Sequence, residues 1–375
     1  MNPLIPSWHD DVSSSRLSNL CTYSTPPSDS LPPELDYLDT NEFPWDLPPR
    51  LKEDLAQQYI RDLASHRYPD AHHWQLRQAI ARYVSEHSPT EISPHQIAVG
   101  NGSDELIRSI LLATAIGGYG SILVAEPTFS IYGILAQTLG IPVHRVHRDP
   151  ETFAVPIAEV NTLLGQAHPP VRVLFMLQPN SPTGNPLTAA EVDWLRQLSE
   201  DILVVIDEAY FEFCGKTLVG DLKAHPNWLI LRTFSKAFRL AGHRVGYAIA
   251  NVDIIAVLEK VRLPYNLPTF SQVAAQVALN HRRELLAAIP TLLAERERLY
   301  ERLQACPQLR VWPSVANFLF FRLQEPEQAQ PLYEFLKKQG TLVRAIAGGI
   351  RVTIGTPEEN QRFWQRFQQA LREVL

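Results

Sequence analysis

The segment ILVVIDEAYFEF, residues 202–213, decides the fold class of this chain of 375 residues. Its first five residues are all apolar, and Asp207 follows them directly. A strand that is apolar on both faces is typical of a parallel sheet that helices cover on both sides. Ligands of such sheets bind at the carboxyl ends of the strands, which is where this segment puts Asp207.

Short apolar runs of this kind recur up to about residue 263 and alternate with segments of helical periodicity. The expected strands are residues 97–100, 121–126, 171–177, 202–207, 228–233 and 244–250. The expected helices are residues 51–64, 74–87, 103–115, 129–140 and 188–200. This alternation predicts an α/β fold with a mostly parallel sheet flanked by helices.

A different pattern follows Leu263, with longer helices between shorter strands. The expected elements are helix 287–305, strand 315–323, helix 332–339, strands 341–346 and 350–355, and helix 357–374. Residues 1–40 are rich in Pro, Ser and Asp and show no clear periodicity. We therefore expect an N-terminal arm (1–40) that packs with a smaller α+β domain (264–375), and a large domain (41–263) that carries the ligand site.

The composition is that of an ordinary soluble enzyme, with 45% hydrophobic and 20% charged residues. The net charge of -6 is mild and no basic block occurs, which argues against a nucleic acid or an acidic membrane as partner. No segment has the roughly 18 apolar residues of a membrane span, and the amino terminus does not resemble a signal peptide. Cys21, Cys214 and Cys306 lie far apart, which argues against disulfides and a zinc site. We expect a cytoplasmic protein without a metal.

The segment LRTFSKAFRLAGHRVGY, residues 231–247, contains a candidate nucleophile, Lys236. Apolar neighbours desolvate the lysine, and burial lowers its pKa so that the neutral amine can form an imine. Ser235 and Arg244 are donors suited to a phosphate close to the lysine. A Ser-Lys pair taken alone is more typical of an exposed loop.

The carboxylate of Asp207 suits a protonated pyridine nitrogen, because it keeps such a ring an electron sink. Tyr210, three residues later, can donate a hydrogen bond to the ring oxygen. A strand-terminal aspartate is also typical of a magnesium site or of a helix cap. The residue alone therefore leaves its role open.

In GNGSDELIRSI, residues 100–110, glycines lead into a helix whose first turn contains Ser103 and Asp104. The free amides and the positive dipole end of such a helix bind phosphate readily. A well-capped helix without a ligand fits the segment equally well. The glycine-rich sequences of nucleotide-binding loops are not completed here.

Two further segments provide groups that suit a flat ring. Phe129 in EPTFSIY (126–132) can stack on a heteroaromatic ring, and Asn180 and Ser181 in LQPNSPTGN (177–185) can bind a ring substituent. Taken alone, they are typical of a core phenylalanine and of a turn.

The combination of these five segments is more specific than any one of them, because all lie at the carboxyl ends of expected strands. Together they provide an imine lysine, a pyridine carboxylate, a ring stacker, ring-oxygen donors and a phosphate cradle. Those are the contacts that pyridoxal 5'-phosphate needs. The sequence thus predicts a pyridoxal-phosphate enzyme with Lys236 and Asp207 as catalytic residues.

The chain resembles the fold-type I aminotransferases of class II, and among them the histidinol-phosphate aminotransferase family. The resemblance extends from Leu20 to the last expected helix and is most specific in LRTFSKAFRLAGHRVGY, VIDEAYFEF, GNGSDELI, RLPYNLPTFSQ, TNEFP and RYPDAH. It implies transfer of an amino group from histidinol phosphate to 2-oxoglutarate, a step of histidine biosynthesis.

The resemblance also implies a homodimer, in which Tyr68 of one subunit reaches the cofactor phosphate of the other. It implies that Tyr23 and Asn41 lie near the substrate and that Arg344 and Arg351 bind its anionic end. Paired guanidinium groups suit both a phosphate and a carboxylate. An ion pair with a nearby surface glutamate is the alternative for Arg351.

Three departures from the family pattern concern the substrate more than the cofactor. Ser181 replaces an asparagine of many relatives, Arg239 stands where glycine is frequent, and only seven residues separate Arg344 from Arg351. An aromatic-amino-acid aminotransferase or a threonine-phosphate decarboxylase would keep almost all the other residues. A catalytically silent binding protein of this fold is disfavoured, because both Lys236 and Asp207 are present.

Overall fold

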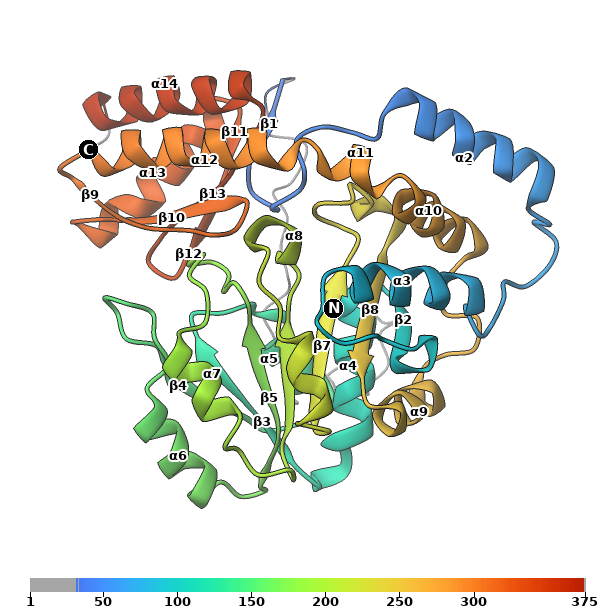
Figure 1. Cartoon of the computed structure of the whole chain (residues 1–375). Helices are drawn as coiled ribbons and strands as arrows, with labels where there is room; N and C mark the ends of the chain where they lie inside the picture. Colours follow the sequence, from blue (N-terminus) through green and yellow to red (C-terminus); the bar gives the residue numbers. More distant parts are fainter. Residues whose placement is uncertain (1–31, 33, 374–375) are drawn as a thin grey trace, which may run out of the picture.

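The computed structural model describes residue 32 and residues 34–373. Tyr23 and most of the expected N-terminal arm lie outside the described residues. Two sheets organise the rest: a large one in the lower part of Figure 1 and a smaller one beneath the helices at the upper left. The described C-terminal helices cover the smaller sheet.

The large sheet has seven strands in the order β2-β8-β7-β6-β5-β3-β4. Their bounds are β2 Ile97–Asn101, β3 Ser121–Glu126, β4 Val143–His147, β5 Val171–Leu177, β6 Leu203–Asp207, β7 Trp228–Thr233 and β8 Val245–Ala250. Six of these strands run in one direction, and β8 runs in the opposite direction. The prediction of a mostly parallel sheet is confirmed.

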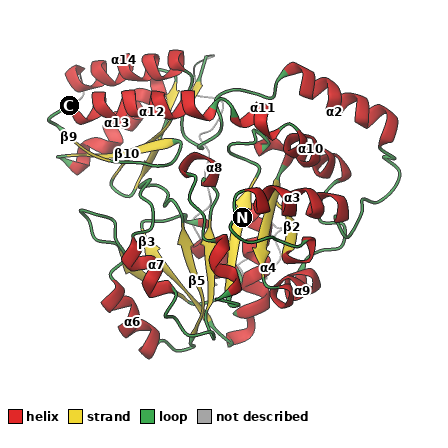
Figure 2. Ribbon diagram, viewed as in Figure 1, coloured by secondary structure: helices red, strands yellow, loops and turns green. Residues whose placement is uncertain are grey.

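Helices cover both faces of this sheet (Figure 2), as the apolar strands require. Their bounds are α2 Pro49–Asp62, α3 Trp74–Glu86, α4 Gly102–Thr114, α5 Ile131–Thr138, α6 Ile157–Gln166, α7 Ala189–Leu195, α8 Phe211–Cys214, α9 Val252–Val261, α10 Thr269–Asn280 and α11 Arg282–Leu286. One core lies on the side of α3, α7 and α10, and another on the side of α4, α5 and α9.

The edge strand β4 and the helices α6, α9 and α10 were not predicted. The sequence of β4, VHRVH, has only two apolar residues, separated by two polar ones, and only Val146 in it is buried. A search for continuous apolar runs misses such a strand, because an edge strand is covered less completely than a central one.

The smaller sheet has four antiparallel strands in the order β12-β13-β10-β9. Their bounds are β9 Leu309–Trp312, β10 Phe318–Leu323, β12 Arg344–Ile346 and β13 Gly349–Thr353. Three helices pack with this sheet: α12 Ile289–Gln304, α13 Ala329–Lys338 and α14 Pro357–Glu373. The expected C-terminal α+β pattern is thus present.

The expected single strand 341–346 is two strands that belong to different sheets. Thr341–Leu342 (β11) pairs in parallel with Asp36–Tyr37 (β1), whereas β12 starts at Arg344 and pairs with β13. The carboxylate of Asp36 holds the β1 pairing by ion pairs with Arg362 and Arg366 of α14. A partner only two residues long leaves no periodic signal in the sequence.

Contacts near the expected domain boundaries are shared between the two halves of the chain. Leu38 and Phe43 lie in the core of the C-terminal helices, and α10, although it follows residue 264, packs against α2 and α3. The division at residues 41 and 264 stays a prediction.

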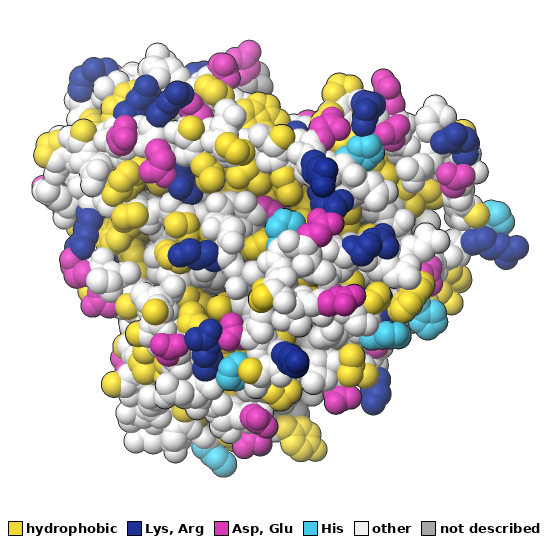
Figure 3. All heavy atoms as spheres, in the orientation of Figure 1, with side chains coloured by type: hydrophobic (Ala, Val, Ile, Leu, Met, Phe, Trp, Pro, Cys, Tyr) yellow, Lys and Arg dark blue, Asp and Glu magenta, His cyan; other side chains and the backbone are white. Residues whose placement is uncertain are grey.

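The described surface carries both signs of charge. On the face in Figure 3, Lys and Arg side chains alternate with Asp and Glu side chains, and no block of one sign dominates. None of the described helices combines the length and the apolar character that crossing a membrane requires.

Candidate active site

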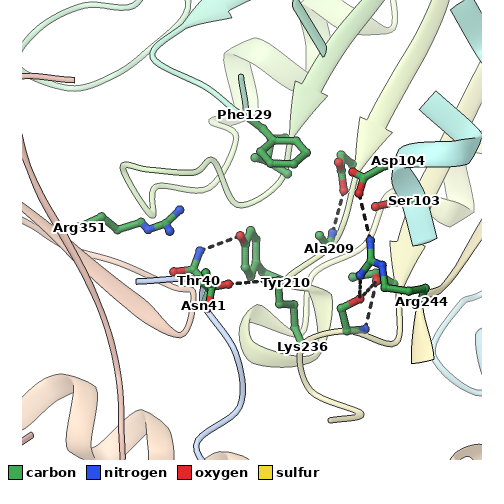
Figure 4. A pocket seen from close by; sticks show the side chains of 14 residues that line it. Thr40, Asn41, Ser103, Asp104, Phe129, Ala209, Tyr210, Lys236, Arg244 and Arg351 are labelled. Atoms are coloured by element: carbon green, nitrogen blue, oxygen red, sulfur yellow. Dashed lines mark hydrogen bonds and ion pairs between the residues drawn. The ribbon is translucent and has the colours of Figure 1, made fainter. Parts of the chain in front are cut away.

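The expected site residues converge on one pocket at the carboxyl edge of the large sheet (Figure 4). The pocket has about 630 Å³ of empty space, part of which is open to solvent. The predicted residues that line it are Asn41, Ser103, Asp104, Phe129, Asp207, Tyr210, Ser235, Lys236, Arg244 and Arg351. Topology explains the convergence, because β2, β3, β6 and β7 all run in one direction and end at this edge.

Lys236 lies three residues beyond the end of β7, in a loop closed by the buried rings of Phe234 and Phe238. Its Nζ donates a hydrogen bond to the carbonyl of Thr40 at 2.6 Å. Burial, helped by the positive charge of Arg351, lowers the pKa of the lysine to about 8. A substantial fraction of the amine is therefore neutral near physiological pH, as an imine-forming lysine requires.

Asp207, the last residue of β6, is 2% exposed at the floor of the pocket. Its Oδ2 accepts a hydrogen bond from the hydroxyl of Tyr132 at 2.7 Å, and its Oδ1 accepts one from the amide of Ala209 at 3.1 Å. Burial raises the pKa of this carboxyl to about 6, against the effect of both hydrogen bonds. A cation beside the carboxylate would offset this cost of burial.

The contribution of Tyr132 was missed by the sequence argument. Tyr132 is the last residue of the segment 126–132, but a tyrosine in an apolar helix is usually interpreted as a core residue. In the structure it is fully buried and stacks on Phe175 with 4.5 Å between the ring centroids. A buried tyrosine hydroxyl needs a polar partner, and this requirement was the one available signal for the Asp207 contact.

The pocket has an anion cradle where α4 begins. Ser103 and Asp104 lie in the first turn of this helix of 13 residues. Ser235 and Arg244 line the same pocket and lie on residues 234–244, the segment between β7 and β8 that also carries Lys236 and is called the lysine loop here. Arg244 Nη2 lies 3.1 Å from Asp104 Oδ2, and its Nη1 lies 3.5 Å from the hydroxyl of Ser235. Free helix amides, two hydroxyls and a guanidinium form a donor set that suits a phosphate.

Two glycines let the backbone close this cradle. A Cβ on Gly246 would lie 2.4 Å from the amide nitrogen of Ser103, and a Cβ on Gly102 would lie 2.7 Å from Arg244 Nη2. Gly102 also has φ +73°, a conformation that side chains disfavour. The absence of side chains here brings the start of α4 against β8.

The opposite wall of the pocket combines an aromatic ring with a polar network. Phe129 follows β3, and its ring borders the pocket across from Lys236 in Figure 4. Tyr210 lies in the core beside it, and its hydroxyl accepts a hydrogen bond from Asn41 Nδ2 at 2.8 Å. Burial raises the pKa of Tyr210, so the phenol stays protonated and remains able to donate.

Asn180 is not among the residues that line the pocket. Its Nδ2 donates to the carbonyl of Pro127 at 3.0 Å and to the hydroxyl of Thr183 at 2.6 Å, and its Oδ1 accepts from the hydroxyl of Thr128 at 3.0 Å. The amide thus ties the turn after β5 to the turn after β3. Its expected contact with a ring substituent stays a prediction that these bonds do not favour.

Ser181 and Arg351 meet beside the pocket. Arg351 of β13 is 8% exposed, and its Nη1 donates to the hydroxyl of Ser181 at 3.0 Å. Its Nη2 donates to the carbonyl of Asp39. Arg344 is half-buried on β12, where it is the direct strand partner of Arg351. The two arginines are neighbours, and Arg351 is the one that lines the pocket.

Tyr68 lies away from the pocket of its own chain. It is 80% exposed, and its ring stacks on Tyr265 with 4.5 Å between the ring centroids. Large aromatic side chains at such exposure are typical of interaction surfaces.

These features define a class before any comparison: an α/β enzyme whose pocket combines a half-buried lysine, a buried aspartate and an anion cradle. The family model of aminotransferase class I and II matches residues 36–367. The chain therefore belongs to the class I and II aminotransferases.

Within this family, the chain is similar to curated histidinol-phosphate aminotransferases. One from Thermosynechococcus vestitus is 82% identical over 95% of this chain and 96% of its own length. Another from Synechococcus elongatus is 57% identical over 91% of this chain and 92% of its own length. The crystal structure of histidinol-phosphate aminotransferase from Sinorhizobium meliloti in complex with pyridoxal-5'-phosphate has a TM-score of 0.80 at 22% identity. The match covers 91% of this chain and 92% of the crystallised chain, and it supports the fold.

Proposed function

We propose that this aminotransferase uses pyridoxal 5'-phosphate to transfer the amino group of histidinol phosphate to 2-oxoglutarate. The products are imidazole acetol-phosphate and glutamate. One observation carries the cofactor assignment: Lys236 and the buried carboxylate of Asp207 line a single pocket together with an anion cradle. The names of the relatives at 82% and 57% identity support the choice of substrates.

The residues of the pocket fit each part of this cofactor. The amine of Lys236 suits its aldehyde, the carboxylate of Asp207 its pyridine nitrogen, and the ring of Phe129 its flat face. The hydroxyl of Tyr210 suits the ring oxygen, and Ser103, Ser235 and Arg244 suit the phosphate. When bound, pyridoxal phosphate would supply an aldehyde that suits the amine of Lys236 and an electron sink for the removal of a substrate proton.

The residues of the pocket then have different roles in the reaction. Asp207 remains an anion beside the ring nitrogen and keeps that nitrogen protonated, because opposite charges favour each other's ionised form. The substrate amine would displace the Nζ of Lys236 from the cofactor, and the freed Nζ would then take a proton from the substrate carbon. A pKa of about 8 leaves about a tenth of the free amine neutral at pH 7, far more than for an ordinary lysine. Tyr132 orients Asp207 through its hydroxyl.

Arg351 and Arg344 are the proposed anion site for both substrates. A guanidinium group binds a phosphate and a carboxylate with the same fork of donors, so one site serves two half-reactions. In the structure Arg351 is aligned by the Ser181 hydroxyl and the Asp39 carbonyl. Asn41 would border the other end of the substrate, and the proposal extends this role to Tyr23.

We further propose a homodimer in the cytoplasm. The exposed Tyr68 would donate its hydroxyl to the phosphate in the partner subunit's site, which accounts for a large aromatic residue at 80% exposure.

The test is an assay of the purified protein with added cofactor. Histidinol phosphate with 2-oxoglutarate should be the preferred pair, and histidinol without the phosphate should be a much poorer donor, because it leaves the arginines without an anion. Phenylalanine and tyrosine serve as rival donors, and threonine phosphate tests for decarboxylation. Preference for an aromatic donor, or release of carbon dioxide, would replace this substrate assignment.

A further inference from the structure

The side chain of Arg239 joins the loop that carries Lys236 to the segment around Asp46 and to the end of α11. Its Nη1 donates to the carbonyl of Asp46 at 2.9 Å, and its Nη2 donates to the carbonyl of Leu285 at 2.9 Å. The guanidinium carbon also lies 4.5 Å from the centre of the Phe43 ring. Because Arg239 follows Lys236 by three residues, one guanidinium links the lysine loop to the segment that carries Phe43 and Asp46.

That segment, residues 39–46, is called the strap here, and two of its residues, Thr40 and Asn41, line the pocket. The carbonyl of Thr40 accepts the hydrogen bond from Lys236 Nζ at 2.6 Å. The side-chain amide of Asn41 donates to the hydroxyl of Tyr210 at 2.8 Å. Any shift of the strap therefore moves two groups that contact the candidate catalytic machinery.

The two ends of the strap are held by different parts of the fold. The first end is fixed to the smaller sheet, because the amide of Asn41 donates to the Thr353 hydroxyl at 3.0 Å and its carbonyl accepts from Asn317 Nδ2 at 3.0 Å. The second end is tied to the large-sheet side by the bond between Arg239 and the carbonyl of Asp46. Arg239 thus closes the strap against the loop that bears the lysine.

Arg239 has a backbone conformation that is unusual for an arginine. Its φ is +60°, in the left-handed region that glycine adopts freely and that costs other residues conformational energy. Local backbone preference therefore opposes an arginine at this position. The contacts of its guanidinium must offset that cost, and these contacts all lead to the strap or to the end of α11.

We propose that Arg239 is a positioning residue that holds the strap against the lysine loop. Through this contact it keeps the Thr40 carbonyl and the Asn41 amide aligned with Lys236 and Tyr210. The inference rests on the proposed function only for its kinetic consequence, since the hold on the strap exists without cofactor or substrate.

Two substitutions remove the guanidinium without straining the backbone, so they distinguish the effects of the two. Arg239→Gly and Arg239→Asn both accept a positive φ, and neither side chain reaches the strap carbonyl. In the cofactor-free protein we expect hydrogen exchange of amides in the strap to become at least about tenfold faster in both variants. Arg239→Lys can still donate to one carbonyl and should lie between these variants and the wild type.

The kinetic experiment compares the effect of each substitution on KM with its effect on kcat. With cofactor bound, Arg239→Gly and Arg239→Asn should raise KM for the amino donor by about tenfold and change kcat by less than about twofold, as expected when binding rather than chemistry is lost. Faster exchange in the strap with a wild-type KM would refute the alignment of the site. If the assay fails for every variant and for the wild type, the exchange experiment still tests the hold on the strap.

A control addresses the other contact of Asp46. Its carboxylate forms an exposed ion pair with Lys52, and such pairs contribute little. Lys52→Ala should leave exchange in the strap within about twofold of the wild type. The proposal is overturned if Lys52→Ala loosens the strap as much as Arg239→Gly does. It is equally overturned if Arg239→Gly and Arg239→Asn lower only the melting temperature and leave strap exchange unchanged.

Discussion

The two sides of the pocket differ in how the fold holds them. On one side, Asp207 and Lys236 lie at or just beyond the ends of central strands that are buried on both faces. On the other side, Asn41 and Arg351 come from the strap and the smaller sheet, and hydrogen bonds to carbonyls and hydroxyls hold them. The first side is fixed by packing and the second by polar contacts between segments far apart in sequence.

The two sides therefore differ in how firmly the fold fixes the positions of their side chains. A buried strand cannot slip by one residue without turning its side chains to the other face, so the position of Asp207 follows from the core itself. The backbone of Arg351 is held by β13, whereas the orientation of its guanidinium involves contacts to Ser181 and Asp39, which local sequence changes can alter. Chemistry common to a family belongs on the first side, and selectivity among substrates belongs on the second.

The largest expected effect lies on the packed side. Lys236→Ala should lower kcat by at least about 10³, because it removes the group that both binds the cofactor covalently and moves the proton. The variant should still bind pyridoxal phosphate through the anion cradle. Borohydride treatment of the wild type should attach the cofactor to the peptide that contains Lys236. Labelling of a different lysine would contradict the assignment.

Asp207→Asn should preserve the shape of the same side and remove only its charge. We expect a loss of about 10² to 10³ in kcat, since the ring nitrogen is no longer held protonated. Tyr132→Phe is the matched variant, because it removes the hydroxyl that contacts Asp207 and leaves the charge in place. It should be affected less than Asp207→Asn. Turnover near the wild-type value in Asp207→Asn would assign this carboxylate another role.

The lysine also has an expected pH signature in the cofactor-free protein. Its pKa lies near 8 instead of 10.5, chiefly because of burial, so the amine gains its proton only as pH falls through about 8. At pH 7 its neutral fraction should exceed that of an ordinary lysine by about two orders of magnitude. Reaction with an amine-acylating reagent, followed on the Lys236 peptide, should show a midpoint near pH 8. A midpoint near 10 would mean that the amine is solvated.

The polar side is expected to give smaller and more selective effects. Arg351→Ala removes a charge-assisted contact worth about 1.5–3 kcal/mol, or one to two decades in affinity. Histidinol phosphate and glutamate should both bind more weakly, because one guanidinium serves both anions. Titration of each substrate against the variant measures this. Weakening of only one of them would mean that the two anions use different sites.

The contrast also explains what the sequence could predict. The strand ends that carry Asp207 and Lys236 follow from apolar runs, and the pocket joins them as expected. The contacts of Asn41 with Thr353, and of Arg239 with Asp46, connect segments about 190 to 310 residues apart, and no periodicity encodes such pairs. The roles of Asn41 and Arg351 were inferred only from the resemblance to a family.

The expected contact of Asn180 with the cofactor ring stays a prediction, and its hydrogen bonds in the structure have a local cause. The turn amide of Asn180 was expected to face the ring but is bonded within its own turn and to the turn after β3. A short polar side chain in a turn satisfies its neighbours first, because buried backbone groups require partners. Ser181, the adjacent departure from the family pattern, instead supplies the hydroxyl that aligns Arg351.

The smallest expected effect tests whether a third source, the partner subunit, completes the pocket. Tyr68→Phe should impair the enzyme, since the proposed phosphate contact loses its donor, and Lys236→Ala should inactivate it. When the two variants are mixed and allowed to exchange subunits, each mixed dimer has one site with both defects and one with neither. Activity should then rise from about half of the Tyr68→Phe value to about a quarter of the wild-type value plus a quarter of the Tyr68→Phe value, because random pairing makes half of the dimers mixed. The mixture before exchange is the control, and activity that stays at its level, or a monomer at assay concentration, would leave Tyr68 without a role in a shared site.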